Sequence, residues 1–167
     1  MITTTAATAF WFLPIVLPIA IWVSWSDMKF MKIPNKAVLA LALGFLVVGP
    51  LALPMDVWLW RWVQLAVVLA VGFVANAARL IGAGDAKFAA AMAPFFPLDD
   101  LRFVLALFAA AIIGAFVSHR TVRAIGPVRA MTSDWASWTH KDFPMGLALS
   151  GTLVFYFLAA LWFALAR

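Results

Sequence analysis

Seven aspartates are the only acidic side chains of this 167-residue chain, because it contains no glutamate. Cysteine is absent as well, which excludes disulfides, a thiol nucleophile and a zinc ribbon. With only His119 and His140, the chain also lacks the ligands of a His-rich catalytic zinc site. We therefore expect no metal and no cofactor, and any acid–base chemistry must come from the aspartates.

Two of these aspartates, Asp27 and Asp85, stand at the borders of apolar segments. Ionisable side chains at membrane depth are costly and are usually kept for function. Two carboxylates within hydrogen-bonding distance share one proton. The ionised one then takes a proton from water while the protonated one polarises a carbonyl group. The pair thus predicts an aspartic peptidase mechanism.

Two glycines directly precede Asp85 in the run Gly82-Ala83-Gly84-Asp85-Ala86-Lys87. Glycine permits backbone angles that are closed to other residues and lets another backbone approach closely. We therefore expect an extended peptide substrate to lie beside this segment. Lys87 is expected either to tune the charge of the aspartate pair or to meet lipid phosphates.

Each aspartate also has a purely structural interpretation. Asp27 alone fits a solvated acid at a helix end among lysines, and Asp85 alone fits a helix cap after a glycine turn. Asn76 is a candidate for a hydrogen bond between helices, and both histidines are expected to lie in loops.

The composition predicts an all-α integral membrane protein. Hydrophobic residues make up 66% of the chain and charged residues 11%, and the mean hydropathy is +1.04. A soluble domain of this size needs far more charged surface. A spanning helix needs about 20 apolar residues, and we expect a single membrane-embedded domain over residues 1–167 with six spans, the fourth of them short. The expected spans are 9–25, 37–53, 63–81, 86–96, 101–117 and 145–166, with Trp58, Trp60 and Trp62 as an aromatic belt before the third and residues 118–142 as a cytoplasmic loop.

The positive charges predict the orientation of these spans. With the N-terminus outside, nine of the twelve Lys and Arg residues fall on the inner side, and only Arg61, Arg102 and Arg167 fall outside. This bias indicates that the net charge of +5 sets the orientation of the protein in the membrane and does not serve nucleic-acid binding. Both termini are then outside, and Asp27 and Asp85 lie at the cytoplasmic border.

The residues around both aspartates resemble those of the type IV prepilin peptidases, a family of Gly-x-Gly-Asp membrane aspartic peptidases. Gly82-Ala83-Gly84-Asp85 matches that signature, and Ser26-Asp27 is followed by Lys32-Ile33-Pro34-Asn35, similar to the Ile-Pro-Asn turn after the family's first aspartate. Phe143-Pro144-Met145-Gly146-Leu147-Ala148 is similar to the Pro-Tyr-Gly segment that opens the family's last span, with Met in place of Tyr. The resemblance covers residues 25–97 well and the last span loosely.

The resemblance implies that Asp27 and Asp85 are catalytic. Gly82, Gly84, Lys87 and the turn Ile33-Pro34-Asn35 would support them. It also implies that the protein removes short basic leaders from prepilin-like proteins at the cytoplasmic face of a bacterial or archaeal membrane. The hydrophobic helix of the substrate would lie in the bilayer beside the enzyme.

Larger members of this family also methylate the new N-terminus and carry a cytoplasmic segment with paired cysteines. This chain has no cysteine and resembles the short enzymes of tight-adherence (Flp) pilus systems and their archaeal relatives. Methyltransferase activity is therefore not expected.

Two other functions remain open at this point. A small proton-coupled transporter or channel subunit also uses intramembrane aspartates, although such proteins often show repeated halves that are not visible here. In a non-catalytic assembly factor for pili or secretion, both aspartates would be caps. In each case the bilayer is a partner, and nucleic acid is not.

Overall fold

The structure, a computed structural model, describes residues 2–166, and helices are the only regular secondary structure in that range. Five of its helices are long and apolar enough to span a membrane, which confirms the predicted all-α membrane fold. The α-helices are α1 (Ala6–Phe30), α2 (Asn35–Ala52), α3 (Met55–Ala77), α4 (Ala83–Met92), α5 (Leu101–Ala124), α6 (Gly126–Met131) and α7 (Met145–Leu165), and the 3-10 turns are Ala93–Phe95, Leu98–Asp100 and Ala136–Trp138.

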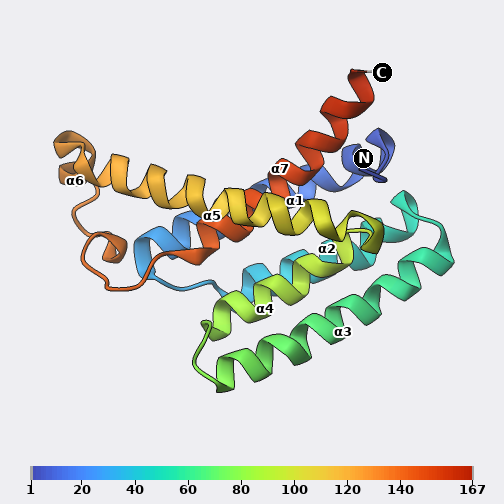
Figure 1. Ribbon diagram of the computed structural model, residues 1–167, viewed down its shortest axis with the longest axis horizontal. Helices are drawn as coiled ribbons and strands as arrows, with labels where there is room; N and C mark the ends of the chain where they lie inside the picture. Colours follow the sequence, from blue (N-terminus) through green and yellow to red (C-terminus); the bar gives the residue numbers. More distant parts are fainter. Residues whose placement is uncertain (1, 167) are drawn as a thin grey trace.

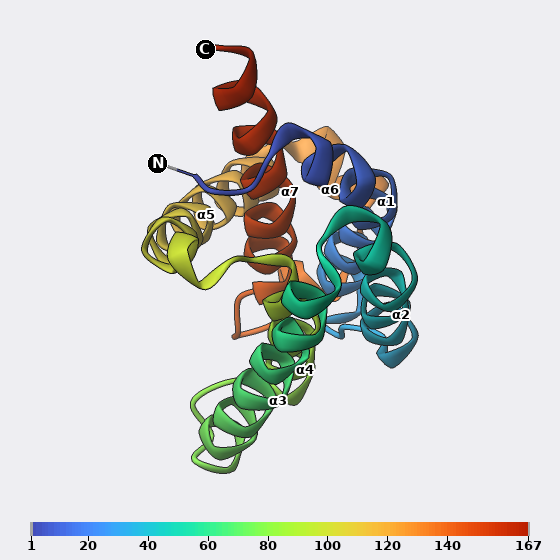
Figure 2. The same cartoon turned by 90° about the vertical axis from the view of Figure 1, so that its right-hand side faces the viewer.

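The helices form two packed groups. Helix α7 lies between α1 and α5, and α1 also packs against α2, while α3 and α4 lie side by side as an antiparallel pair (Figures 1 and 2). In both views the two ends of the chain lie at the same end of the molecule. The count of six spans and their orientation stay predictions, because the short α4 is not among the five candidate spans.

Helix α3 has other bounds than the third expected span, 63–81. Helix α3 begins at Met55, directly after Pro54, so the three tryptophans expected before the span lie within the helix. A proline that precedes the first helical turn costs no hydrogen bond there. The helix ends at Ala77 because Arg79 adopts a left-handed conformation (φ 61°) and the Leu80 N–H closes the end on the Ala75 carbonyl at 2.9 Å.

The loop predicted over residues 118–142 is largely folded. Helix α5 continues to Ala124, and α6 and a 3-10 turn follow it. His119 therefore lies in a helix rather than a loop, and it is only 6% exposed because its ring stacks on Trp138 at 5.1 Å. His140 lies in the loop as expected.

The fourth helical segment is short, as predicted, and a non-helical stretch completes its path. Helix α4 has ten residues, and two 3-10 turns then carry the chain to α5. Backbone that leaves a helix in an apolar bundle must find partners within the protein. The buried guanidinium of Arg61 donates to the carbonyls of Pro94 and Phe95 (3.2 and 3.5 Å). Gln64, with its amide group turned to face them, donates to the carbonyls of Ala93 and Phe96.

An aromatic cluster ties this stretch to the rest of the molecule. The Phe95 ring lies 5.0 Å from Phe12 of α1 and 5.2 Å from Phe45 of α2, and it also contacts Phe157 of α7. All four side chains are fully buried. Edge-to-face contacts of this kind add to the stability gained from burial.

Asp100 fastens the N-terminal segment at the end of the molecule where the chain begins. Its buried carboxylate accepts hydrogen bonds from the Thr3 N–H (2.8 and 3.0 Å), the Thr4 N–H (3.4 Å) and the Tyr156 hydroxyl of α7. Thr4 and Tyr156 also share a hydrogen bond between their hydroxyl groups. These bonds satisfy a carboxylate that would otherwise be costly to bury.

Replacement of this carboxylate should destabilise the fold. Asp100→Asn puts an amide donor where N–H and O–H donors converge, so we expect a loss of about 1.5–3 kcal/mol in the free energy of unfolding. Thermal unfolding in detergent measures the loss. The neighbouring Asp99→Asn is the control, because Asp99 is exposed. Equal stability of the two variants would contradict the prediction.

Candidate active site

A cavity of about 310 Å³ lies where the last turn of α1, the turn before α2 and the start of α4 meet. Asp27 and Asp85 both line it. The structure thus brings the two aspartates to one place. Five of the other predicted residues also line the cavity, and only Pro34 of the predicted set does not: Ile33, Asn35, Gly82, Gly84 and Lys87.

Asp27 is held by the first turn of α7. Its side chain is buried, and Oδ2 accepts a hydrogen bond from the Gly146 N–H at 2.6 Å. That N–H belongs to the first turn of a helix, where backbone donors have no partner within the helix. A Cβ atom on Gly146 would stand 2.9 Å from both Oδ2 and Cβ of Asp27. Only glycine therefore lets the two helices approach this closely.

The end of α1 turns the chain back toward the cavity. Met31 adopts the left-handed conformation (φ 52°), and its N–H donates to the Asp27 carbonyl at 2.9 Å. The Ser26 hydroxyl donates to the Lys32 carbonyl at 2.9 Å. Pro34 then precedes the first residue of α2. These bonds hold the turn beside the carboxylate that it follows in sequence.

The two glycines before Asp85 have different tasks. Gly82 precedes the first residue of α4, and a Cβ atom there would stand 2.6 Å from Oδ2 of Asp85, so the carboxylate folds back over this glycine. A Cβ atom on Gly84 would stand 3.4 Å from Cβ of Ile33. Gly82 thus serves close packing inside the site, whereas a Cβ atom on Gly84 would make an ordinary van der Waals contact, and an extended substrate beside this segment stays a prediction.

Two further polar contacts position the start of α4. The Lys87 ammonium group donates to Oδ1 of Asn35 at 3.3 Å, which links α4 to the start of α2. The Asn76 amide donates to the Ile81 carbonyl at 2.9 Å, within the turn that joins α3 to α4. Asn76 therefore holds this turn rather than bridging two helices by their side chains.

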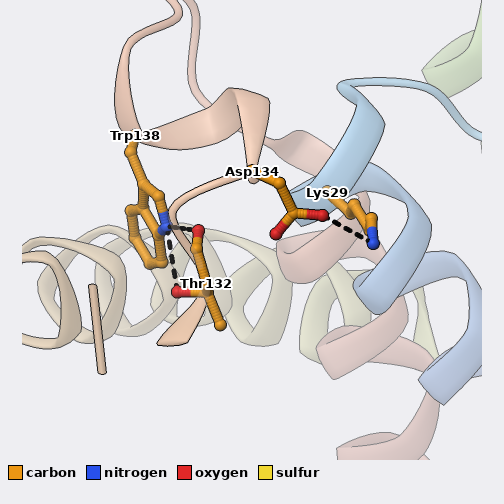
Figure 3. Close-up of polar contacts among 4 residues, drawn as sticks. All are labelled: Lys29, Thr132, Asp134 and Trp138. Carbon is orange, nitrogen blue, oxygen red and sulfur yellow. Dashed lines mark hydrogen bonds and ion pairs between the residues drawn. The ribbon is translucent and has the colours of Figure 1, made fainter. Parts of the chain in front are cut away.

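The loop before α7 is fastened to the end of α1. Lys29 and Asp134 form an ion pair at 2.8 Å, and the Trp138 indole N–H donates to the carbonyl and hydroxyl oxygens of Thr132 at 2.8 and 3.1 Å (Figure 3). The hydrogen bond from Lys29 lowers the pKa of the Asp134 carboxyl group below its usual value. The Asp134 carboxyl group is therefore ionised at neutral pH.

Gly146, which binds Asp27, was not predicted to act in the site. The sequence placed Gly146 in a segment similar to the start of the family's last span, which was the only signal for it. Its contact with Asp27 joins residues 119 positions apart, and no local pattern reveals such a contact.

Loss of the Lys29–Asp134 pair should loosen the loop. We expect Asp134→Asn to speed backbone hydrogen exchange over residues 132–142, after correction for intrinsic exchange. Because the pKa of Asp134 is lowered, the pair stabilises the folded loop at pH values above 3.8 and is lost only as the pH falls below it. Wild-type protection should thus stay constant between about pH 6 and 8.

Asp142→Asn is the matched control, because Asp142 is exposed and pairs at 3.6 Å with His140 of the same loop. Identical exchange in the two variants would show that the ion pair does not hold the loop.

Comparison with known proteins places this arrangement in a family. A search of curated proteins and a search of solved structures each gave no match. The family model of the type IV leader peptidases matches residues 14–119, which include both aspartates and all residues that line their cavity. Because the match covers well over half of the chain, the protein belongs to the type IV leader peptidase family.

Proposed function

We propose that the protein is an aspartic endopeptidase that removes the basic leader of Flp-type prepilins, with Asp27 and Asp85 as its catalytic pair. The observation that carries this proposal is the shared cavity: two aspartates from distant parts of the chain line it. Membership of the family indicates leader cleavage as the reaction. The cavity contains two carboxyl groups that can perform it.

The contacts of Asp27 suit it to activate water. The Gly146 N–H fixes Oδ2, which leaves Oδ1 to accept a proton from the attacking water. The water oxygen bonds to the scissile carbonyl carbon while the protonated partner donates to the carbonyl oxygen. Collapse of this intermediate breaks the C–N bond, and the amine nitrogen leaves with a proton from a carboxyl group.

The proposed location of the reaction is the cytoplasmic face of the membrane. Lys32 and Lys87 line the cavity, and Lys29 lies in the last turn of α1, which leads into it. Under the positive-inside rule this end of the molecule faces the cytoplasm. Both termini then face outward, and the leader is cut from the inside.

Removal of either carboxylate should abolish leader cleavage. We expect Asp27→Asn and Asp85→Asn each to slow processing of a co-expressed prepilin by about 100- to 10,000-fold, because each removes one partner in proton transfer. Leader removal is followed on a gel at equal enzyme levels. Asp142→Asn, a change of the same kind in the exposed loop, should process normally.

Full processing by either aspartate variant would disprove the catalytic pair. A transporter or an assembly factor would give no processing even in the wild type.

The close approach of α7 to Asp27 should matter for catalysis as well. Gly146→Ala adds a Cβ atom 2.9 Å from the carboxylate and must displace it. A shift of about 1 Å in a catalytic group can cost about 100-fold in rate, and we expect a loss of that size in single-turnover cleavage. Gly126→Ala is the control, because a Cβ atom there meets no atom within 4 Å. Wild-type cleavage by Gly146→Ala would show that Asp27 does not need this contact.

A further inference from the structure

A second cavity, of about 650 Å³, lies at the end of the molecule where the chain begins. Its walls come from the N-terminal segment, the turn between α2 and α3, and the 3-10 stretch before α5. Figure 1 shows the N-terminal segment and the turn between α2 and α3 at this end. Thr8 of its wall and Asp27 both belong to α1 and are about 28 Å apart along the helix. The cavity is therefore separate from the proposed active site.

Arg61 of α3 is the buried charge of this cavity. Its side chain lines the cavity and is 7% exposed, and a single nitrogen, Nη1, donates to the carbonyls of Pro94 and Phe95. Within the described chain, Nη2 and Nε have no hydrogen-bond partner, and neither of them is fully enclosed. The N–H groups of these two nitrogens are thus available to a ligand in the cavity.

The positive charge of Arg61 has no ionic partner among the described residues. Asp100 is the buried acid of this region, but its oxygens accept the donors of Thr3, Thr4 and Tyr156. A buried charge without an ionic partner is costly. An anion that enters the cavity would offset this cost, and the planar guanidinium group suits a phosphate, which accepts two parallel N–H bonds.

The rim of the same cavity is acidic. Asp56, in the first turn of α3, and Asp99 both line the cavity and are exposed. Along the helix axis, Asp56 lies about 7.5 Å nearer the start of α3 than Arg61 does. Two carboxylates at the entrance repel a ligand that is only an anion. They favour a zwitterion whose anionic group lies deep in the cavity and whose cationic group lies at the rim.

The cavity also opens onto an apolar surface. Trp60 and Leu98 line it and are 73% and 68% exposed. Tryptophan side chains are enriched at the level of the lipid headgroups. Under the predicted orientation, this end of the molecule lies at the outer surface of the membrane. A lipid headgroup can therefore reach the cavity while its alkyl chains stay in the bilayer.

We propose that this outer cavity binds the headgroup of a phospholipid that carries a primary ammonium group, such as phosphatidylethanolamine. The phosphate accepts hydrogen bonds from Nη2 and Nε of Arg61, and the ammonium group donates to the carboxylates of Asp56 and Asp99. This site does not depend on the proposed peptidase function. Because Arg61 also holds the carbonyls where α4 ends, the bound lipid stabilises the stretch between α4 and α5.

A competition between two lipids tests this pattern of charges. The protein is stripped of lipid in detergent and mixed with equal amounts of phosphatidylethanolamine and phosphatidylglycerol that have the same acyl chains. Native mass spectrometry then counts the bound lipids. Both lipids carry a phosphate, but phosphatidylglycerol has no ammonium group. We expect the wild type to prefer phosphatidylethanolamine about threefold or more, because the ammonium group pairs with the acidic rim.

Reversal of one rim charge should reverse this preference. Asp56→Lys places a cation where the ammonium group binds, so we expect it to favour phosphatidylglycerol. Asp142→Lys makes the same change of charge on the exposed loop before α7 and should keep the preference of the wild type. Equal binding of the two lipids by the wild type, or an unchanged preference in Asp56→Lys, would overturn the proposal.

A variant of Arg61 tests the phosphate contact. Arg61→Gln keeps an amide donor for the carbonyls of Pro94 and Phe95 but removes the charge, and we expect it to weaken phosphatidylethanolamine binding about tenfold or more. Arg102→Gln, an exposed position on α5 outside the cavity, should bind as the wild type does. Undiminished binding by Arg61→Gln would refute the contact, and displacement of the lipid by excess inorganic phosphate would show a site for a free anion instead. If Arg61→Gln does not fold, the competition with Asp56→Lys decides alone.

Discussion

A chain in a bilayer must bond its polar backbone groups within itself, because no water reaches them in the hydrocarbon layer. This requirement explains the middle of the molecule. Where α4 stops, the freed carbonyl groups are received by Arg61 and Gln64 of α3. The short helix α4 can therefore end inside the bundle. It extends only from the cavity to the aromatic cluster at Phe95.

The same requirement favours helix ends as the place for the site. The first N–H groups of α7 have no partners within the helix, and the carboxylate of Asp27 accepts one of them from Gly146. At the end of α1, the last carbonyl groups likewise need partners. Met31 adopts the left-handed conformation, and its N–H donates a hydrogen bond to the Asp27 carbonyl. Asp27 thus closes the end of α1 through its backbone carbonyl and joins α1 to α7 through its side chain, so a residue proposed to act on water also fixes the packing around it.

Some features of the fold and the site could be predicted from local sequence patterns, and others could not. The apolar segments predicted the helical membrane fold, and the spacing of motifs predicted that Asp27 and Asp85 would meet. The burial of His119 and the roles of Arg61 and Gly146 depend on contacts between distant segments, which leave no trace in neighbouring residues. Helix α3 begins before the expected span, and the hydrogen bond from the Trp58 indole N–H to the Phe45 carbonyl, which ties this part of α3 to α2, could not be predicted from neighbouring residues.

The two carboxylates belong to different packed groups of helices. Asp27 lies on α1, whose packing against α7 is the most extensive helix contact in the structure, whereas Asp85 lies on α4, which packs chiefly against α3. The turn between α1 and α2 bridges these groups, with Ile33 against Gly84 and Asn35 bonded to Lys87. These two contacts therefore set how far Asp85 stands from Asp27. The turn Ile33-Pro34-Asn35 is thus a spacer between the two aspartates that we propose as the catalytic pair.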